Sequence, residues 1–199
     1  MPNKTNEMIR YVAFRLFVEV GYEATNIRNI CKEVDIKPAS LYFYYKSKED
    51  LFFSIYDEVW EDKIKVLSNI AELEHNISPN MKLYFLYKRS MDYYSENIIK
   101  MKFLLRYHLF PPEDLANIIR DKYREWSGKE DKIIEDIIKQ CMERRVLPDD
   151  RDLSDYVLEY KTFEREQLIE MIINNIKKNE REFDRSWLRF WNCNMSNSV

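Results

Sequence analysis

The segment Thr25–Lys48 constrains the fold of this chain more than any other stretch, because it encodes two short helices joined by a tight turn. Thr25 is the expected N-cap of the first helix, since its hydroxyl can accept a hydrogen bond from a free backbone N–H. Asp35 stands at the turn and tolerates a left-handed backbone, and Pro38 suits the first turn of the second helix. The apolar side chains of the first helix recur at helical spacing and share one face: Ile27, Ile30, Cys31 and Val34.

The second helix of this segment separates an apolar face from a polar and aromatic one. Leu41 and Tyr45 are expected to be buried together, so that Ser40, Tyr42 and Tyr44 point elsewhere. The neighbouring cations are Lys37, Lys46 and Lys48. Lysines on phosphates with short polar and aromatic groups at base edges suit a DNA groove. The alternative is a solvated lysine surface on an ordinary helical pair.

The order and spacing of several short motifs extend this pattern to both sides. They are Ala13-Phe14-Arg15-Leu16-Phe17, Gly21-Tyr22 with Thr25, Ile30, Val34-Asp35-Ile36, Leu41-Tyr42 and Lys48-Glu49-Asp50-Leu51. With these motifs, residues 9–51 resemble the DNA-binding domain of TetR/AcrR-family transcriptional regulators, over about a quarter of the chain. The chain departs from the family pattern at Asp35, Lys37, Tyr44 and Tyr45, which leaves the operator sequence open.

Composition predicts an all-α protein, because 199 residues include only two glycines and six prolines, with 34% charged residues. The resemblance implies a three-helix helix-turn-helix DNA-binding domain over residues 1–48 and a helical effector-binding and dimerisation domain over residues 49–199. Residues 1–48 hold eight Lys/Arg and five Asp/Glu, which is a net charge of +3. Because the whole chain has a net charge of −3, residues 49–199 have a net charge of −6. The basic end is therefore the expected DNA-binding end.

Helical periodicity and capping signals predict the remaining helices. The first helix is expected over about residues 5–20 with Gly21 as its C-terminal cap, and Ser47 is expected to cap the fourth. Later helices are expected to open at Ser78-Pro79, to run over 98–110, to begin near 113, and to cover about 152–178 and 180–194. Gly128 either ends the helix that begins near 113 or is tolerated inside it.

The resemblance implies phosphate contacts from Thr25, Tyr42 and Lys48, whose hydroxyl, phenol and ammonium groups can all donate hydrogen bonds. Arg28 either reaches a guanine or is an ordinary surface arginine. The predicted DNA-binding set also includes the recognition-helix positions that face bases in the family and the cations around them. The full set is Thr25, Arg28, Lys37, Pro38, Ala39, Ser40, Tyr42, Tyr44 and Lys48.

The resemblance also implies a small apolar or aromatic effector held by the C-terminal helices. Plain core packing is the competing interpretation of each candidate, because aromatic stripes at helical spacing usually form cores. The candidate lining residues are Tyr84, Tyr87, Met91, Phe103, Tyr107, His108, Tyr123 and Trp126.

The last two predicted helices are rich in apolar side chains, which need a partner surface. The resemblance implies that they pair with their copies in a four-helix homodimer interface, whereas the alternative is that they close the core of a single subunit. The predicted interface residues are Tyr156, Tyr160, Phe163, Met171, Phe183, Trp187 and Trp191.

Motifs of other function classes are missing from the sequence. There is no Gly-rich phosphate loop, nucleophile elbow or metal-spaced His/Cys cluster, so neither an enzyme nor a cofactor or metal is expected. Three unpatterned cysteines favour a reducing cytosol, and no signal peptide or membrane-length apolar run is present. The sequence and resemblance together predict a ligand-relieved homodimeric repressor on a palindromic double-stranded DNA operator. The alternative is a coactivator that acts through a partner regulator without reading DNA.

Overall fold

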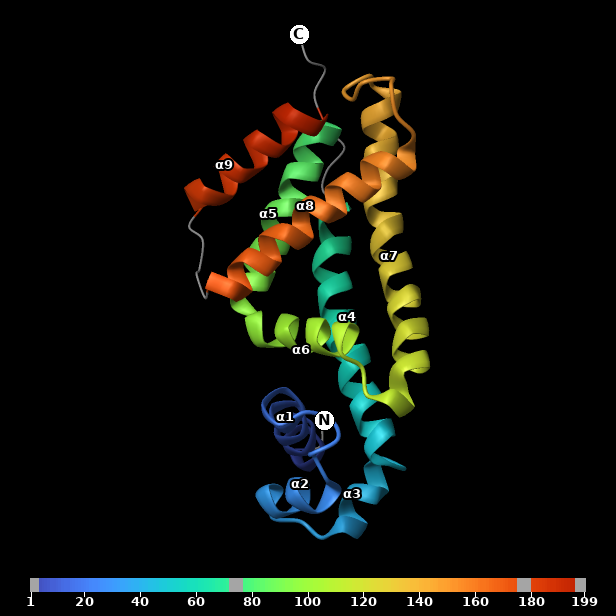
Figure 1. The fold of residues 1–199 in the computed structure, drawn as a ribbon, viewed down its shortest axis with the longest axis vertical. Helices are drawn as coiled ribbons and strands as arrows, with labels where there is room; N and C mark the ends of the chain where they lie inside the picture. The colour runs from blue at the N-terminus through green and yellow to red at the C-terminus, as the bar shows by residue number, and fades with distance from the viewer. Residues whose placement is uncertain (1–3, 72–76, 175–179, 196–199) are drawn as a thin grey trace. The chain divides into compact units, whose positions relative to one another are not determined.

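A computed structural model describes residues 4–71, 77–174 and 180–195, and every regular element in these ranges is helical. The all-α prediction is therefore confirmed. A 3-10 turn, Glu113–Leu115, precedes α7, and a π-helical turn, Trp191–Met195, follows α9. The helices are α1 (Lys4–Glu19), α2 (Ile27–Val34), α3 (Pro38–Tyr44), α4 (Lys48–Ala71), α5 (Pro79–Glu96), α6 (Ile98–Leu109), α7 (Ala116–Glu143), α8 (Leu153–Asn174) and α9 (Glu180–Phe190) (Figure 1).

The described residues pack as two compact units. The first unit comprises residues 4–61 and 99–122, so it contains α1 to α3, most of α4, nearly all of α6 and the start of α7. The second comprises residues 62–71, 77–98, 123–174 and 180–195. The boundaries between the units fall within α4, at the first residue of α6 and within α7, so three helices have residues in both units. The division of function at residue 48 stays a prediction.

An aromatic cluster forms the core of the first unit. The ring of Phe52, on α4, lies 5.3 Å from that of Phe17 on α1 and 4.8 Å from that of Tyr107 on α6. Phe103 of α6 lies 5.0 Å from Tyr107 and completes the cluster. Each of these side chains is buried, and burial of one large apolar side chain contributes about 1.5–3 kcal/mol. Helix α6 is thus part of the core beneath the helix-turn-helix.

The ends of the first helices follow local sequence signals, with one correction. Gly21 has the positive φ of 89° expected of a C-terminal cap, and Asp35 has the left-handed φ of 56° expected at the turn. The Ser47 hydroxyl oxygen accepts from the Asp50 N–H at 3.0 Å, as its capping role predicts. The predicted N-cap of α2 was wrong by one residue: Asn26 is the cap, and its side chain accepts from Asn29 N–H at 2.9 Å.

A second aromatic cluster forms the core of the other unit. Trp187 of α9 stacks against Tyr87 of α5 with ring centroids 5.5 Å apart. Phe163 of α8 stacks on Phe190 of α9 at 4.2 Å, with the rings within 7° of parallel. Offset aromatic pairs contribute about 0.5–1.5 kcal/mol beyond burial, so these contacts hold α5, α8 and α9 together.

The structure resolves the question left open at Gly128. Helix α7 continues through this residue without a break, so the glycine is tolerated inside the helix. The expected end of α8 near residue 178 lies outside the described residues. Among the helices that the structure describes, none is both long and apolar enough to cross a bilayer.

Candidate nucleic-acid interface

Helix α3 is fixed to the first unit by one face. Leu41 and Tyr45 are both buried, as their spacing predicted. The Tyr45 hydroxyl donates a hydrogen bond of 2.6 Å to the side-chain oxygen of Asn6 on α1, which ties the end of the helix to the core. The main-chain N–H of Ile36 donates to Cys31 O at 3.0 Å and closes the turn from α2. The opposite face of α3 is therefore turned to solvent.

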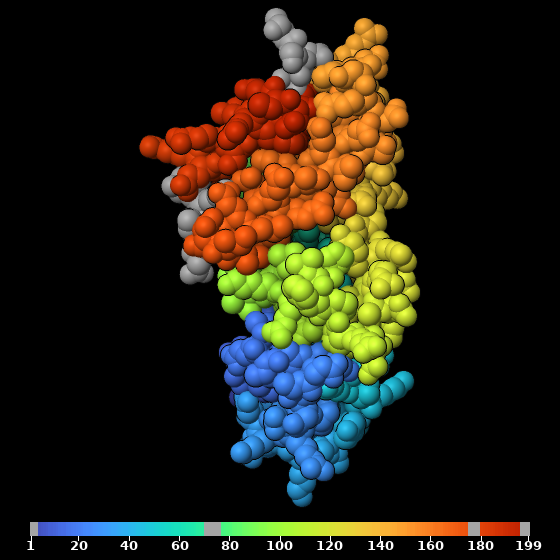
Figure 2. Space-filling model, viewed as in Figure 1, coloured from blue at the N-terminus to red at the C-terminus, as the bar shows by residue number. Residues whose placement is uncertain are grey.

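The predicted DNA-contacting residues of α3 lie outside its buried face. Tyr42 is 53% exposed, and Tyr44 is half-buried. Figure 2 shows the blue residues of this region at the surface of the first unit. The other exposed members of the predicted set on or beside α3 are Lys37, Pro38, Ala39 and Ser40, and Lys46 follows them, also exposed.

Cations dominate the outward surface of α2. Glu33, the acidic residue of this helix, forms an ion pair with Arg15 of α1. Arg15 also pairs with Glu19 at 2.9 Å. Arg28 and Lys32 are exposed, and with Glu33 neutralised they give the surface of α2 a positive charge. Such a surface favours a polyanionic partner.

Thr25 has a structural role that the sequence did not reveal. The side chain is only 1% exposed, and its hydroxyl donates to Gly21 O at 2.7 Å, which closes the loop between α1 and α2. A phosphate contact through this hydroxyl would require the loop to move, so that contact stays a prediction.

Lys48 is likewise tied into the loop rather than extended into solvent. Its ammonium group donates to Tyr22 O at 2.9 Å and to Thr25 O at 3.1 Å. The ammonium also lies 4.0 Å from the centroid of the Tyr22 ring, a cation–π geometry. An ammonium has three N–H groups, and two are used by these carbonyls. Lys48 thus connects the start of α4 to the loop before α2.

Phe43 is the one residue of α3 whose placement sequence reasoning did not consider. It is 82% exposed, and the ring of Tyr44 meets it edge-on at 5.2 Å. A usable signal was present, because Phe43 follows Ala39 by four residues and therefore shares its helical face.

The helix-turn-helix geometry agrees with comparisons against known proteins. The family described as "Bacterial regulatory proteins, tetR family" matches residues 9–55. Residues 9–55 of this chain are therefore similar to the TetR family. Over 66 residues the chain is 39% identical to the biofilm operon icaADBC HTH-type negative transcriptional regulator IcaR of Staphylococcus aureus (strain Newman). This matched segment is 33% of each chain. The IcaR of Staphylococcus epidermidis (strain ATCC 35984) is 48% identical over 40 residues, 20% of this chain and 22% of the relative.

The chain spans only about a fifth to a third of the length of these curated relatives, whereas solved TetR structures match the fold nearly end to end. A TetR transcription regulator from Haloarcula marismortui superposes with a TM-score of 0.72 at 18% identity, over 94% of each chain. The regulator FadR from Bacillus subtilis, in complex with stearoyl-CoA, superposes with a TM-score of 0.73 at 16% identity, over 92% of this chain and 96% of that one. At such identities the likeness establishes the TetR fold.

The predicted effector-lining residues divide between the two units. Phe103 and Tyr107 belong to the aromatic core of the first unit, and the Tyr107 hydroxyl donates to Phe17 O at 2.8 Å. His108 is exposed on α6. The structure therefore assigns these three residues to the first unit. The second unit holds Tyr84, Tyr87, Met91, Tyr123 and Trp126.

The second unit also contains a buried ionisable cluster that sequence reasoning missed. Lys63 of α4 pairs with Glu130 of α7 at 2.6 Å, and the Tyr94 hydroxyl donates to Glu164 Oε1 of α8 at 3.0 Å. Burial raises the pKa of Glu164, against the opposing effect of Lys63. Burial acts to lower the pKa of Lys63, but Glu130 and Glu164 outweigh it and raise the pKa. With every group ionised, the cluster of one lysine and two glutamates would carry one net negative charge.

Most predicted dimer-interface residues are already enclosed by their own subunit. Trp187 packs on Tyr87, and Tyr156 donates its hydroxyl to Pro148 O at 2.7 Å. These side chains pack in the core of their own subunit, and their part in a homodimer interface stays a prediction. The buried members are Tyr156, Tyr160, Phe163, Met171, Phe183 and Trp187, and Trp191 is half-buried.

Proposed function

We propose that this chain is a homodimeric transcriptional repressor that binds a palindromic DNA operator and leaves it when a small apolar or aromatic molecule binds. The observation that carries the proposal is the exposed face of α3, with Lys37, Ala39, Ser40 and Tyr42 turned to solvent and the helix tied to α1 through Tyr45. Repression is supported by the IcaR relatives, which are named as negative transcriptional regulators.

Roles at the operator divide by chemistry. Lys37, Lys46 and Tyr42 donate to phosphates and set affinity, whereas Ala39 and Ser40 meet base edges. A phosphate contact releases counterions, so loss of a lysine weakens binding to every sequence and flattens the salt dependence. Loss of Ser40 instead changes sequence preference.

The homodimer is proposed to form through the exposed side of α8. Leu158, Ile169 and Ile173 are exposed apolar residues of this helix. Their spacings of 11 and 4 place them within one helical face, opposite the face that packs in the core. An apolar stripe of this kind on an amphipathic helix is suited to pairing with its copy in a second subunit. The exposed α8 face is therefore the proposed interface.

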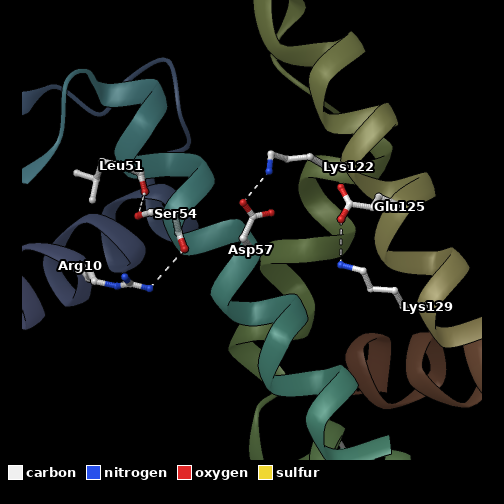
Figure 3. A network of polar contacts seen from close by, with 7 residues as sticks. All are labelled: Arg10, Leu51, Ser54, Asp57, Lys122, Glu125 and Lys129. Atoms are coloured by element: carbon white, nitrogen blue, oxygen red, sulfur yellow. Dashed lines mark hydrogen bonds and ion pairs between the residues drawn. The ribbon is translucent and has the colours of Figure 1, made fainter. Parts of the chain in front are cut away.

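The effector is proposed to act through helices that have residues in both units. Within the first unit, Arg10 of α1 donates to Ser54 O of α4 at 3.4 Å and also pairs with Glu58. On the other side of α4, Asp57 pairs with Lys122 of α7 at 2.6 Å (Figure 3). Helix α4 is thus tied both to α1, which carries the helix-turn-helix, and to α7. A displacement of α4 or α7 would be transmitted through these contacts to the recognition helices.

Relief of repression needs an effector with different affinities for the two states, because equal affinity shifts no equilibrium. A hundredfold loss of operator affinity corresponds to about 2.7 kcal/mol of coupling, within the usual range for allosteric proteins. Bacillus subtilis FadR was solved with stearoyl-CoA, so acyl-CoA thioesters belong among the compounds tested, beside free aromatic molecules.

Footprinting on the DNA upstream of the chain's own gene tests the proposal. We expect a protected near-palindrome whose half-site centres lie roughly 34–36 Å apart, as two-fold related recognition helices require. A single asymmetric half-site would contradict the dimeric arrangement. Binding to a partner regulator, with no protection of any duplex, would favour the coactivator. An effector that binds tightly yet leaves operator affinity unchanged would contradict relief by that compound.

A further inference from the structure

Phe43 is the most exposed large apolar side chain among the described residues, at 82%. Exposure forgoes the contribution of about 1.5–3 kcal/mol that burial of a phenylalanine makes to stability. Single exposed apolar residues are common on protein surfaces, so the exposure alone indicates nothing. The position of Phe43 on the outward face of α3, among the predicted DNA-binding residues, is what distinguishes it from other exposed apolar residues.

The surroundings of Phe43 are apolar along the helix and cationic at both ends. Ala39, four residues earlier, is exposed and lies on the same helical face. Tyr44 meets the Phe43 ring edge-on at 5.2 Å and limits its orientations. Lys37 precedes the helix and Lys46 follows it, both exposed. An apolar strip between two cations fits a DNA groove, where phosphates flank the base edges.

The phenyl ring has neither a hydrogen-bond donor nor an acceptor. It therefore cannot bind a phosphate or pair with the polar edge of a base. In the major groove one apolar group distinguishes a base, the 5-methyl group of thymine. Resting on the proposed function, we infer that Phe43 reads the 5-methyl group of a thymine in each operator half-site and is a specificity-determining residue.

Replacement of thymine by deoxyuridine tests this inference, because it removes the methyl group and leaves base pairing intact. Each thymine of the footprinted operator is replaced in turn, at symmetric positions in both half-sites. Loss of one buried methyl group is expected to weaken binding about fourfold per half-site. We expect this loss at one symmetric thymine position that Phe43 contacts.

The Phe43→Ala variant tests the protein side of the same contact. It should bind the thymine and deoxyuridine operators equally at that position, because the contact partner of the methyl group is gone. The salt dependence of binding should stay as in the wild type, whereas Lys46→Ala should flatten it. Phe110→Ala is the matched control: Phe110 is 77% exposed in the first unit but lies outside the helix-turn-helix. Its variant should keep the full sensitivity to the methyl group.

The outcomes separate cleanly. If the wild-type protein binds its operator with no thymine-methyl sensitivity, or if Phe43→Ala retains that sensitivity, the inference is overturned while the proposed function stands. If no duplex is bound at all, the proposed function fails and the inference fails with it. Because Phe43 makes little contact with the core, Phe43→Ala should keep the wild-type melting temperature, which confirms that any loss of sensitivity arises at the interface.

Discussion

The buried hydroxyl of Tyr107 on α6 donates a hydrogen bond of 2.8 Å to the main-chain oxygen of Phe17 in α1. The neighbouring Arg106 donates to Val18 O at 2.9 Å. The last carbonyls of a helix have no partner within it, so α6 supplies donors to the end of α1. The helix-turn-helix is thus anchored to α6 as well as to α4.

Tyr107→Phe should lower the free energy of unfolding by about 1 kcal/mol, because it leaves the buried Phe17 carbonyl without this donor. Urea denaturation of the two proteins measures the difference. Tyr11→Phe is the control, since Tyr11 is exposed on α1 and its change should have no effect. Equal stability of Tyr107→Phe and the wild type would mean that the carbonyl finds another donor.

The two glycines should respond to alanine in opposite directions. Gly128 lies inside α7 with nothing within 4 Å of an added Cβ, so Gly128→Ala should stabilise the protein; the gain is expected to be about 0.5–1 kcal/mol. Gly21 has φ +89°, and its Cβ would lie 2.6 Å from Arg106 Nη2. Gly21→Ala should therefore destabilise by more than about 1 kcal/mol. Chemical denaturation measures both, and a change of the same sign at the two sites would refute this assignment.

Lys48 and Lys46 should differ although both are lysines near α3. Lys48→Ala removes two hydrogen bonds to loop carbonyls and should lower the free energy of unfolding by about 1–3 kcal/mol as well as weakening DNA binding. Lys46→Ala should weaken DNA binding with unchanged stability. Thermal denaturation beside a mobility-shift assay separates the two effects. An undiminished melting temperature for Lys48→Ala would restore the simpler view of Lys48 as a phosphate contact only.

The buried cluster predicts a pH-dependent stability. Because burial raises the pKa of Glu164, the folded state binds this proton more readily than the unfolded state. The contribution of Glu164 to stability is therefore fully present below its ordinary pKa of about 4.5 and is lost as pH rises through its raised folded pKa. Glu164→Gln leaves the Lys63–Glu130 pair electrically balanced, with Ser90 and Tyr94 beside it. This variant should be more stable than the wild type at neutral pH.

The advantage of Glu164→Gln should shrink as pH falls toward 4, which unfolding curves recorded across the range would reveal. Glu166→Gln, at an exposed position of the same helix, is the control and should follow the wild type. A glutamine variant that is less stable at neutral pH would indicate that Lys63 holds Glu164 as a favourable carboxylate.

Substitutions on the two sides of α8 and α9 should separate assembly from folding. Ile173→Asp changes a side chain that is 73% exposed, so it should dissociate the proposed dimer by placing a charge in an apolar interface and leave the subunit folded. Trp187→Ala should instead destabilise the subunit by about 3–5 kcal/mol, because it removes a core ring. Analytical ultracentrifugation and thermal denaturation report the two properties. A dimer that survives Ile173→Asp would exclude the exposed α8 face as the interface.

The sequence by itself determined the local architecture of the helix-turn-helix. Gly21, Asp35, Pro38 and Ser47 act within one turn of their own position, and such signals need no distant partner. The spacing of Leu41 and Tyr45 likewise identified the buried face of α3, because helical periodicity is a local property.

Only the tertiary structure decided which neighbour each apolar stripe meets. Periodicity predicts that Tyr107 and Trp187 are buried but not which residues they contact. In the folded chain Tyr107 contacts α1 and Trp187 packs on α5. The same holds for Lys48, whose charge suggested phosphate while the folded loop brought two carbonyls within hydrogen-bonding distance. The physical reason is that burial is nondirectional and depends on helices far apart in the chain, whereas a helix cap or a turn is specified by the residues that form it.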